Sequence, residues 1–133
     1  MTDPKRERPT DAQLAILSVL WTAGPATVRE VHEALPEASK RGYTTTLKQM
    51  QIMAEQGLVE RDESHRSHVY KANVVQSETQ GRLVDDLMQK AFGGSATRLV
   101  MRALSGKAAS AEELAEVREL LDRLEGERQG GTR

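Results

Sequence analysis

Apolar residues recur at intervals of three and four along three segments of the N-terminal half, which is the spacing of one face of an α-helix. The positions with this spacing are Leu14, Leu17, Leu20 and Trp21, then Val28, Val31 and Leu35, then Leu47, Met50 and Met53 or Ala54. They predict helices over residues 11–22, 28–35 and 44–56. Pro25 and Pro36 end the first two helices, because proline disfavours helical backbone at the residue before it.

The hydrophobic period changes after the third helix. Gly57 is suited to the left-handed conformation that often follows a helix end. Residues 58–61 and 68–72 then have the composition of short strands, and the polar residues 62–67 between them suit the turn of a β-hairpin. Two short strands are marginal by themselves, so the hairpin must pack on the three helices. Residues 37–42 are predicted to form a loop.

The C-terminal half has a different organisation. Glycines at 93, 94 and 106 divide it into three predicted helices, residues 78–92, 96–105 and 111–126. Their apolar faces consist of Leu83, Leu87 and Ala91; Leu99, Val100, Ala103 and Leu104; and Leu114, Val117, Leu121 and Leu124. Little else in the chain can cover three such faces, which favours burial against a partner chain. The alternative is an ordinary bundle within one chain.

Helix starts carry a common signal, a Ser or Thr followed three residues later by Glu or Gln. In this capping box, each side chain satisfies a free amide of the first helical turn. The candidates are Thr10 with Gln13, Thr27 with Glu30, Ser77 with Gln80, and Ser110 with Glu113.

The order of three helices and a hairpin is that of a winged helix, in which the second and third helices form a helix-turn-helix. We therefore predict a mainly α fold with a small β-hairpin. The expected organisation is a flexible N-terminus at 1–9, a winged helix-turn-helix domain at 10–74, a three-helix dimerisation domain at 75–126 and a flexible tail at 127–133.

The composition of the chain excludes several classes of function. The chain has no cysteine, which excludes disulfides, thiolate nucleophiles and cysteine-based zinc sites. No apolar run reaches the roughly 20 residues that a membrane helix needs, and the N-terminus lacks a signal-peptide core, so we expect a cytoplasmic protein without membrane insertion. His65 and His68 lie near acidic residues, but no third ligand with regular spacing accompanies them. With no glycine-rich phosphate loop and no Ser-His-Asp pattern, we expect no enzyme, no catalytic or metal-binding residue and no cofactor.

Bulk charge does not indicate a nucleic-acid partner. Residues 1–73 hold ten Lys/Arg and ten Asp/Glu, and residues 74–133 hold nine and ten, so the halves sum to 0 and −1. A DNA-binding function must therefore depend on where individual side chains lie.

The third predicted helix carries polar side chains opposite its core stripe, at Thr44, Thr45, Lys48 and Gln49, with Ile52 beside them. Threonine can contact a phosphate or a thymine methyl, glutamine can pair with an adenine edge, and lysine can reach guanine or phosphate. An ordinary solvated helix face is the alternative. Threonine is a poor helix former, and three in succession at a helix start favour the functional interpretation.

The hairpin tip carries His65, Arg66, Ser67 and His68, which suits contact with the sugar–phosphate backbone. A solvated turn explains this composition equally well. The full set of expected backbone contacts is Thr27, Lys40, Arg41, Arg66, Ser67 and His68.

Several motifs in order resemble the penicillinase-repressor family (the BlaI/MecI group) over about residues 8–125. They are Thr10-Asp11-Ala12 leading to Leu20-Trp21, Thr27-Val28-Arg29-Glu30-Val31, Tyr43-Thr44-Thr45, Gly57-Leu58-Val59, His68-Val69-Tyr70, Phe92-Gly93-Gly94-Ser95 and Ser110-Ala111-Glu112-Glu113-Leu114. The resemblance implies homodimers that bind inverted-repeat operators and repress β-lactamase or other cell-envelope and stress genes. It places base contacts on Tyr43, Thr44, Thr45 and Lys48 and the wing on residues 66–70.

The resemblance also implies a membrane-bound sensor protease as a partner, which cleaves the repressor in its dimerisation region. The chain departs from the family here, because the Asn-Phe cleavage dipeptide of some members is missing and Asn73 is the only asparagine. The absence of cysteine also excludes the copper-sensing cluster of another branch.

Two other functions fit the pattern. One is a winged-helix module for protein–protein contact without a DNA function, and near-neutral charge supports it. The other is a repressor gated by a small ligand, although no aromatic-rich pocket is evident in the sequence.

Overall fold

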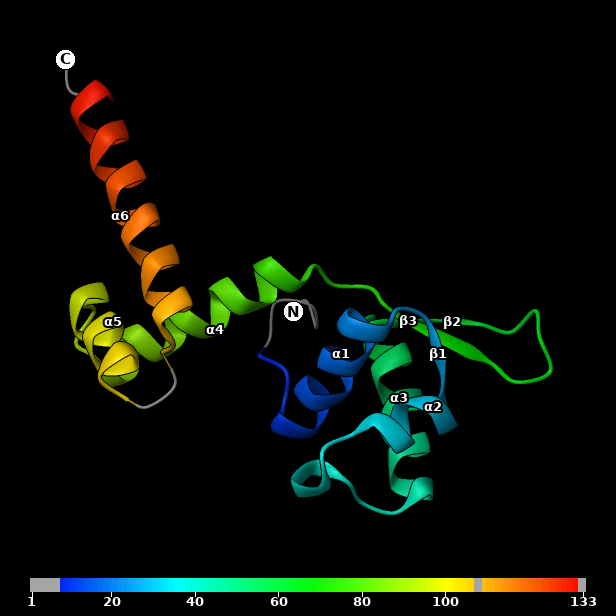
Figure 1. Cartoon of the computed structure of the whole chain (residues 1–133). Coiled ribbons are helices and arrows are strands. Elements are labelled where there is room, and N and C mark those ends of the chain that lie inside the picture. Colours follow the sequence, from blue (N-terminus) through cyan, green and yellow to red (C-terminus); the bar gives the residue numbers. More distant parts are fainter. Residues whose placement is uncertain (1–7, 107–108, 132–133) are drawn as a thin grey trace. The chain divides into compact units, whose positions relative to one another are not determined.

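The computed structural model describes residues 8–106 and 109–131 (Figure 1). The chain forms two compact units, residues 1–85 and 86–133, with the boundary inside one helix. In order along the chain, the elements are α1 (Asp11–Ala23), β1 (Ala26–Thr27), α2 (Val28–Ala34), the 3-10 helix η2 (Glu37–Ser39), α3 (Tyr43–Gln56), β2 (Val59–Asp62), β3 (Val69–Ala72), α4 (Gln76–Ala91), α5 (Ala96–Ser105) and α6 (Ala111–Gly131). The predicted fold class is confirmed, with mostly helix, one small sheet and a winged-helix order in the first unit.

Side-chain caps fix the starts of α1 and α2, as predicted. The Thr10 hydroxyl accepts from the Gln13 amide while the Gln13 side chain accepts from the Thr10 amide. Thr27 and Glu30 form the same reciprocal pair. The Gln13 side chain also donates from Nε2 to Gln56 Oε1 over 2.9 Å, which links the start of α1 to the end of α3.

The core of the first unit lies between α1, α2, α3 and the sheet. Its buried apolar residues are Ile16, Leu17, Leu20, Ala26, Val28, Val31, Leu35, Met50, Met53, Leu58, Val59 and Tyr70. Leu14 and Trp21, which lie on the predicted apolar face of α1, are only half-buried. The Trp21 indole Nε1 donates to the Val74 carbonyl at 3.1 Å. This bond ties α1 to the chain as it leaves the sheet.

The sheet has three strands, one more than expected. β3 lies in the middle, with β1 and β2 antiparallel on its two sides. Thr27 pairs with Val69, and Arg61 pairs with Tyr70. A two-residue strand such as β1 shows no alternation, so it could not be recognised from the sequence pattern.

The segment between α2 and α3 is more ordered than the predicted loop, since Glu37–Ser39 forms a 3-10 turn. Helix α3 begins at Tyr43, with Gly42 as its N-cap residue, one position before the predicted start. Gly57 follows its end with φ +83°, the left-handed conformation that was expected. That residue turns the chain into the sheet.

Helix α4 begins at Gln76, two residues before the predicted start, and ends at Ala91. Ser77 therefore lies inside its first turn, and the predicted capping box there is wrong. Gly93 and Gly94 both have positive φ, and the Gly94 amide donates back to the Met88 carbonyl to close the helix end.

Ser95 caps α5, and the Ser110–Glu113 capping box at the start of α6 is present as predicted. Helix α6 continues to Gly131, so residues 127–131 are helical rather than part of a flexible tail. The predicted flexible N-terminus lies mostly outside the described residues. Among those that the structure describes, no helix is long and apolar enough to span a membrane.

Candidate nucleic-acid interface

Helix α3 presents a buried face and an opposite exposed face. Thr46, Met50 and Met53 are buried, whereas Leu47 and Ala54 are half-buried and pack against the core from its edge. Met50 and Met53 are buried as expected from the core stripe, but Thr46 takes the fully buried position that was expected for Leu47. The Thr46 hydroxyl lies 2.9 Å from Nδ1 of His32 on α2.

The structure separates the predicted contact residues of α3. Thr44, Thr45 and Lys48 are exposed, and Gln49 is half-buried. Gln51, which was not among the residues predicted to contact DNA, is exposed. At 3.6 residues per turn, Thr44, Lys48 and Gln51 lie within an arc of about 60°, whereas Gln49 is rotated by about 100° from Lys48 toward the other flank.

Tyr43, the first residue of α3, is held by two side chains of α2. Its ring meets His32 edge to face with centroids 5.7 Å apart, and the Arg29 guanidinium lies 5.0 Å from its centroid. The ring remains 38% exposed. Such contacts fix the orientation of an aromatic side chain at the surface.

Strand alternation places Arg61 on the inner face of the wing hairpin. Val59, two residues earlier, is buried, and Tyr70, the paired residue on β3, is buried as well. Arg61 follows them on that face, where the hairpin extends past the core. Its guanidinium pairs with Glu63 at 2.6 Å, and a hydrogen bond to Tyr70 raises the pKa of Arg61 above its ordinary value.

The opposite face of the hairpin carries compensated charges. Glu60 and Lys71 are paired across the strands with 3.6 Å between Oε1 and Nζ. At the turn, the Asp62 carboxylate accepts from the Ser64 amide at 2.9 Å. Hydrogen bonds from Ser64 lower the pKa of Asp62 below its ordinary value.

A hollow of about 460 Å³ lies between α3, the start of α2 and the wing; we call it the α3–wing hollow. It is lined by Thr27, Val28, Arg29, Tyr43, Leu47, Gln51, Arg61, Arg66, Ser67, His68 and Tyr70. The lining contains three guanidinium groups and an imidazole but no carboxylate. The chain as a whole is nearly neutral, but positive charge is concentrated in this hollow, as binding to a polyanionic partner requires.

Some of the other side chains predicted to contact the DNA backbone form hydrogen bonds within the protein. Lys40 Nζ donates to the Glu33 carbonyl and lies 3.7 Å from Glu37 Oε1. The Arg41 side chain donates to the carbonyls of Ala38 and Lys40. Thr27 caps α2 and also lines the α3–wing hollow. Arg66, Ser67 and His68 are exposed on the wing.

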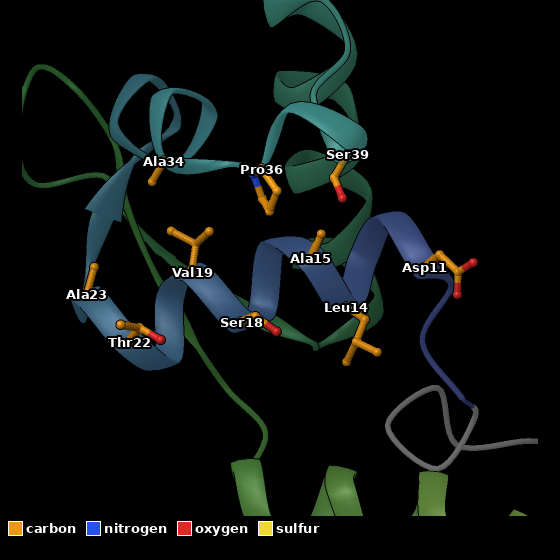
Figure 2. A pocket seen from close by; sticks show the side chains of 10 residues that line it. All are labelled: Asp11, Leu14, Ala15, Ser18, Val19, Thr22, Ala23, Ala34, Pro36 and Ser39. Atoms are coloured by element: carbon orange, nitrogen blue, oxygen red, sulfur yellow. The ribbon is translucent and has the colours of Figure 1, made fainter. Parts of the chain in front are cut away.

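Two further observations concern a metal site and a site for a small molecule. Within residues 8–106 and 109–131, no three His, Asp or Glu side chains gather in a way that could hold a metal ion. A groove of about 550 Å³ runs between α1 and the α2–η2 segment, where Ala15 and Val19 face Ala34 and Pro36 (Figure 2). Asp11 is its only titratable lining residue and it has no aromatic residue, so it offers apolar contact and little else.

Three helices, an antiparallel hairpin wing and an exposed polar face on the third helix define a winged-helix regulator. Comparison with known proteins gives the particular family. The family model described as Penicillinase repressor matches residues 9–123. The chain belongs to the penicillinase-repressor family, which confirms the resemblance seen in the sequence, and it is a transcriptional repressor rather than an enzyme.

Two curated relatives are similar to it. Both are named Transcriptional regulator BlaI, from Mycobacterium tuberculosis strains CDC 1551 / Oshkosh and ATCC 25618 / H37Rv. Each is 36% identical over 93 residues, which cover 68% of this chain and 67% of the relative.

Proposed function

We propose that the chain acts as a homodimeric repressor that binds an inverted-repeat DNA operator, with α3 in the major groove and the wing on the adjoining backbone. The observation that carries this proposal is the α3–wing hollow beside the exposed face of α3, which is lined by three arginines and by no carboxylate, although Glu63 outside the lining pairs with Arg61. Tyr43, Thr44, Thr45 and Lys48 are the proposed base-contacting residues, and Gln51 lies on the same side of α3 as Thr44 and Lys48. The genes under control are proposed to be those of β-lactamase or of other cell-envelope and stress functions.

Exposed apolar residues of the second unit support dimerisation. None of its described residues is buried in the single chain. Leu87, Val100, Leu121 and Leu124 are 44–53% exposed. Leu99, Leu104, Leu114 and Val117 are half-buried, as is Leu83 in the first unit. Apolar surfaces of this kind on a folded chain mark sites of association, and two identical copies bury them symmetrically.

The DNA-binding part is tested with the doubly substituted protein Thr45→Ala, Lys48→Ala. Fluorescence anisotropy measures binding to a duplex selected from a random palindromic library and to an unselected duplex of equal length. The wild type is expected to prefer the selected duplex, with binding that weakens steeply with salt, and the variant is expected to lose that preference. Full preference in the variant would remove these residues from the interface.

The alternative, a winged helix used only for protein–protein contact, gives a different result in the same assay. Such a module should show no affinity for either duplex even at low salt, because it has no reason to neutralise phosphates.

Dimerisation is tested with Leu121→Glu, Leu124→Glu, and the matched control is Glu125→Lys on the same helix. Sedimentation velocity is expected to show a dimer for the wild type and the control and a monomer for the double variant, since buried carboxylates without partners are costly. A dimer that persists in the double variant would exclude this face of α6 from the interface.

A membrane-bound sensor protease remains a proposed partner that relieves repression. The α5 segment that corresponds to the cleaved region contains exposed Val100 and Met101 but no Asn-Phe. Any cleavage must therefore use another peptide bond.

A further inference from the structure

The α3–wing hollow collects cations from three parts of the first unit. Arg29 comes from α2, Arg61 from β2 and Arg66 from the wing tip. Within the described part of the chain, neither Arg29 nor Arg66 forms an ion pair with a carboxylate. Of the acidic groups of the hairpin, Glu63 pairs with Arg61, whereas Glu60 and Asp62 line a neighbouring hollow that Arg61 also borders.

Two of these cations are held in place before any ligand arrives. The Arg29 guanidinium lies over the Tyr43 ring, 5.0 Å from its centroid. A guanidinium held by an aromatic ring can still donate from its N–H groups to another partner. Arg61 is held by Tyr70 and Glu63. Guanidinium groups fixed in this way suit a tetrahedral oxyanion, because each can offer two parallel N–H donors.

The position of the hollow indicates which kind of oxyanion would bind there. When α3 occupies the major groove, a wing beside it meets the neighbouring minor groove, and one strand of the sugar–phosphate backbone separates the two grooves. That strand would pass between α3 and the wing, where the hollow lies.

We propose that the α3–wing hollow holds one phosphodiester group of the DNA backbone, with Arg29, Arg61 and Arg66 as its donors. Glu63 weakens this contact because it competes with the phosphate for Arg61. The inference rests on the proposed DNA-binding function and adds to it a site that supplies affinity without base preference.

The chain offers matched controls on the two faces of the same hairpin. Arg61→Gln and Arg66→Gln remove cations of the hollow, whereas Lys71→Gln removes a cation of the opposite face. Glu63→Gln removes the competing carboxylate, whereas Glu60→Gln removes a carboxylate that pairs with Lys71. Arg66, at the exposed tip, serves as the variant least able to disturb folding, and thermal unfolding confirms that each protein is folded.

The experiment is a salt series of anisotropy titrations with the selected duplex and the unselected duplex. Arg61→Gln and Arg66→Gln are expected to weaken binding to both duplexes by the same factor and to reduce the slope of log K against log salt by about 1. Glu63→Gln is expected to tighten binding to both. Lys71→Gln and Glu60→Gln are expected to have the smaller effects.

An unchanged salt slope in Arg66→Gln and Arg61→Gln, with the wild type binding normally, would overturn the phosphate site and leave the proposed function intact. Equal effects from Lys71→Gln would overturn it as well. A wild type that binds neither duplex would overturn the proposed function and this site together. Inorganic phosphate is the second possible source of the oxyanion. The NMR signals of the arginine side chains are therefore titrated with inorganic phosphate and with the duplex. If inorganic phosphate binds with the lower Kd, the proposal that the hollow holds a DNA phosphodiester is wrong.

Discussion

The imidazole of His32 lies against the hydroxyl of Thr46, with Nδ1 and Oγ1 2.9 Å apart. The contact joins the two helices of the helix-turn-helix, α2 and α3. Thr46 is only 3% exposed, whereas its neighbours Thr44 and Thr45 are exposed. The three consecutive threonines therefore divide into two surface residues and one that fastens α3 to α2.

Thr46→Val should destabilise the protein by about 1 kcal/mol, because valine keeps the shape of threonine but leaves the half-buried imidazole without this partner. Urea unfolding of the variant measures the loss. Thr45→Val is the matched control and should stay within about 0.5 kcal/mol of the wild type, since that side chain is exposed. Equal losses in the two variants would show that the hydrogen bond to His32 is not what stabilises the helix pair.

The capping boxes give a second stability comparison. Thr10→Ala should cost about 1 kcal/mol, because the Gln13 amide loses its acceptor at the start of α1. Ser77→Ala should change stability by no more than about 0.5 kcal/mol, because Ser77 lies inside the first turn of α4. Thermal unfolding of both variants checks the difference, and a comparable cost at position 77 would restore the capping role that its sequence suggested.

Local signals account for most of the elements that the sequence predicted. The apolar period and the caps located α1, α2 and α3, and Gly57 marked the end of α3 because only a residue that tolerates positive φ suits that turn. Ser77 carried the same cap signal without being a cap. There β3 ends at Ala72 and α4 begins at Gln76. Tertiary contacts such as the hydrogen bond from Trp21 to Val74 fix the short segment between them, and with it the residue at which α4 begins.

The part of the interface that the sequence did not predict depends on elements far apart in the chain. Arg29, Gln51 and Arg61 come together only because the hairpin runs past α3, and no local pattern encodes that direction. A weak signal was present for Arg61, since its alternation with buried Val59 assigns it to the inner face of the hairpin. The strand β1 was not predicted for the same reason, because its two residues form a strand only by pairing with β3, which is distant in the sequence.

The turn of the wing should respond to acid. Hydrogen bonds from Ser64 hold the pKa of Asp62 below its ordinary value of 3.8, so this carboxylate stabilises the turn at neutral pH. That contribution is complete above the ordinary pKa and is lost as the pH falls through the lower value of the folded protein. The Ser64 amide resonance should therefore titrate with a midpoint below 3.8, and Asp62→Asn should abolish the titration. A midpoint at or above 3.8 in the wild type would mean that the turn does not form in solution.

The two glutamines of α3 give the sharpest test of how the helix faces DNA. Gln51 is exposed, lines the α3–wing hollow and lies near Lys48 and Thr44 on the helix surface, whereas Gln49 is half-buried on the other flank. Gln51→Ala should therefore reduce the preference for the selected duplex, by about 1–3 kcal/mol if the amide makes a bidentate base contact. Gln49→Ala should leave that preference nearly unchanged. Anisotropy titrations with selected and unselected duplexes measure both. If Gln49→Ala shows the larger loss, α3 must be rotated in the groove toward the flank that carries Gln49 and Ile52.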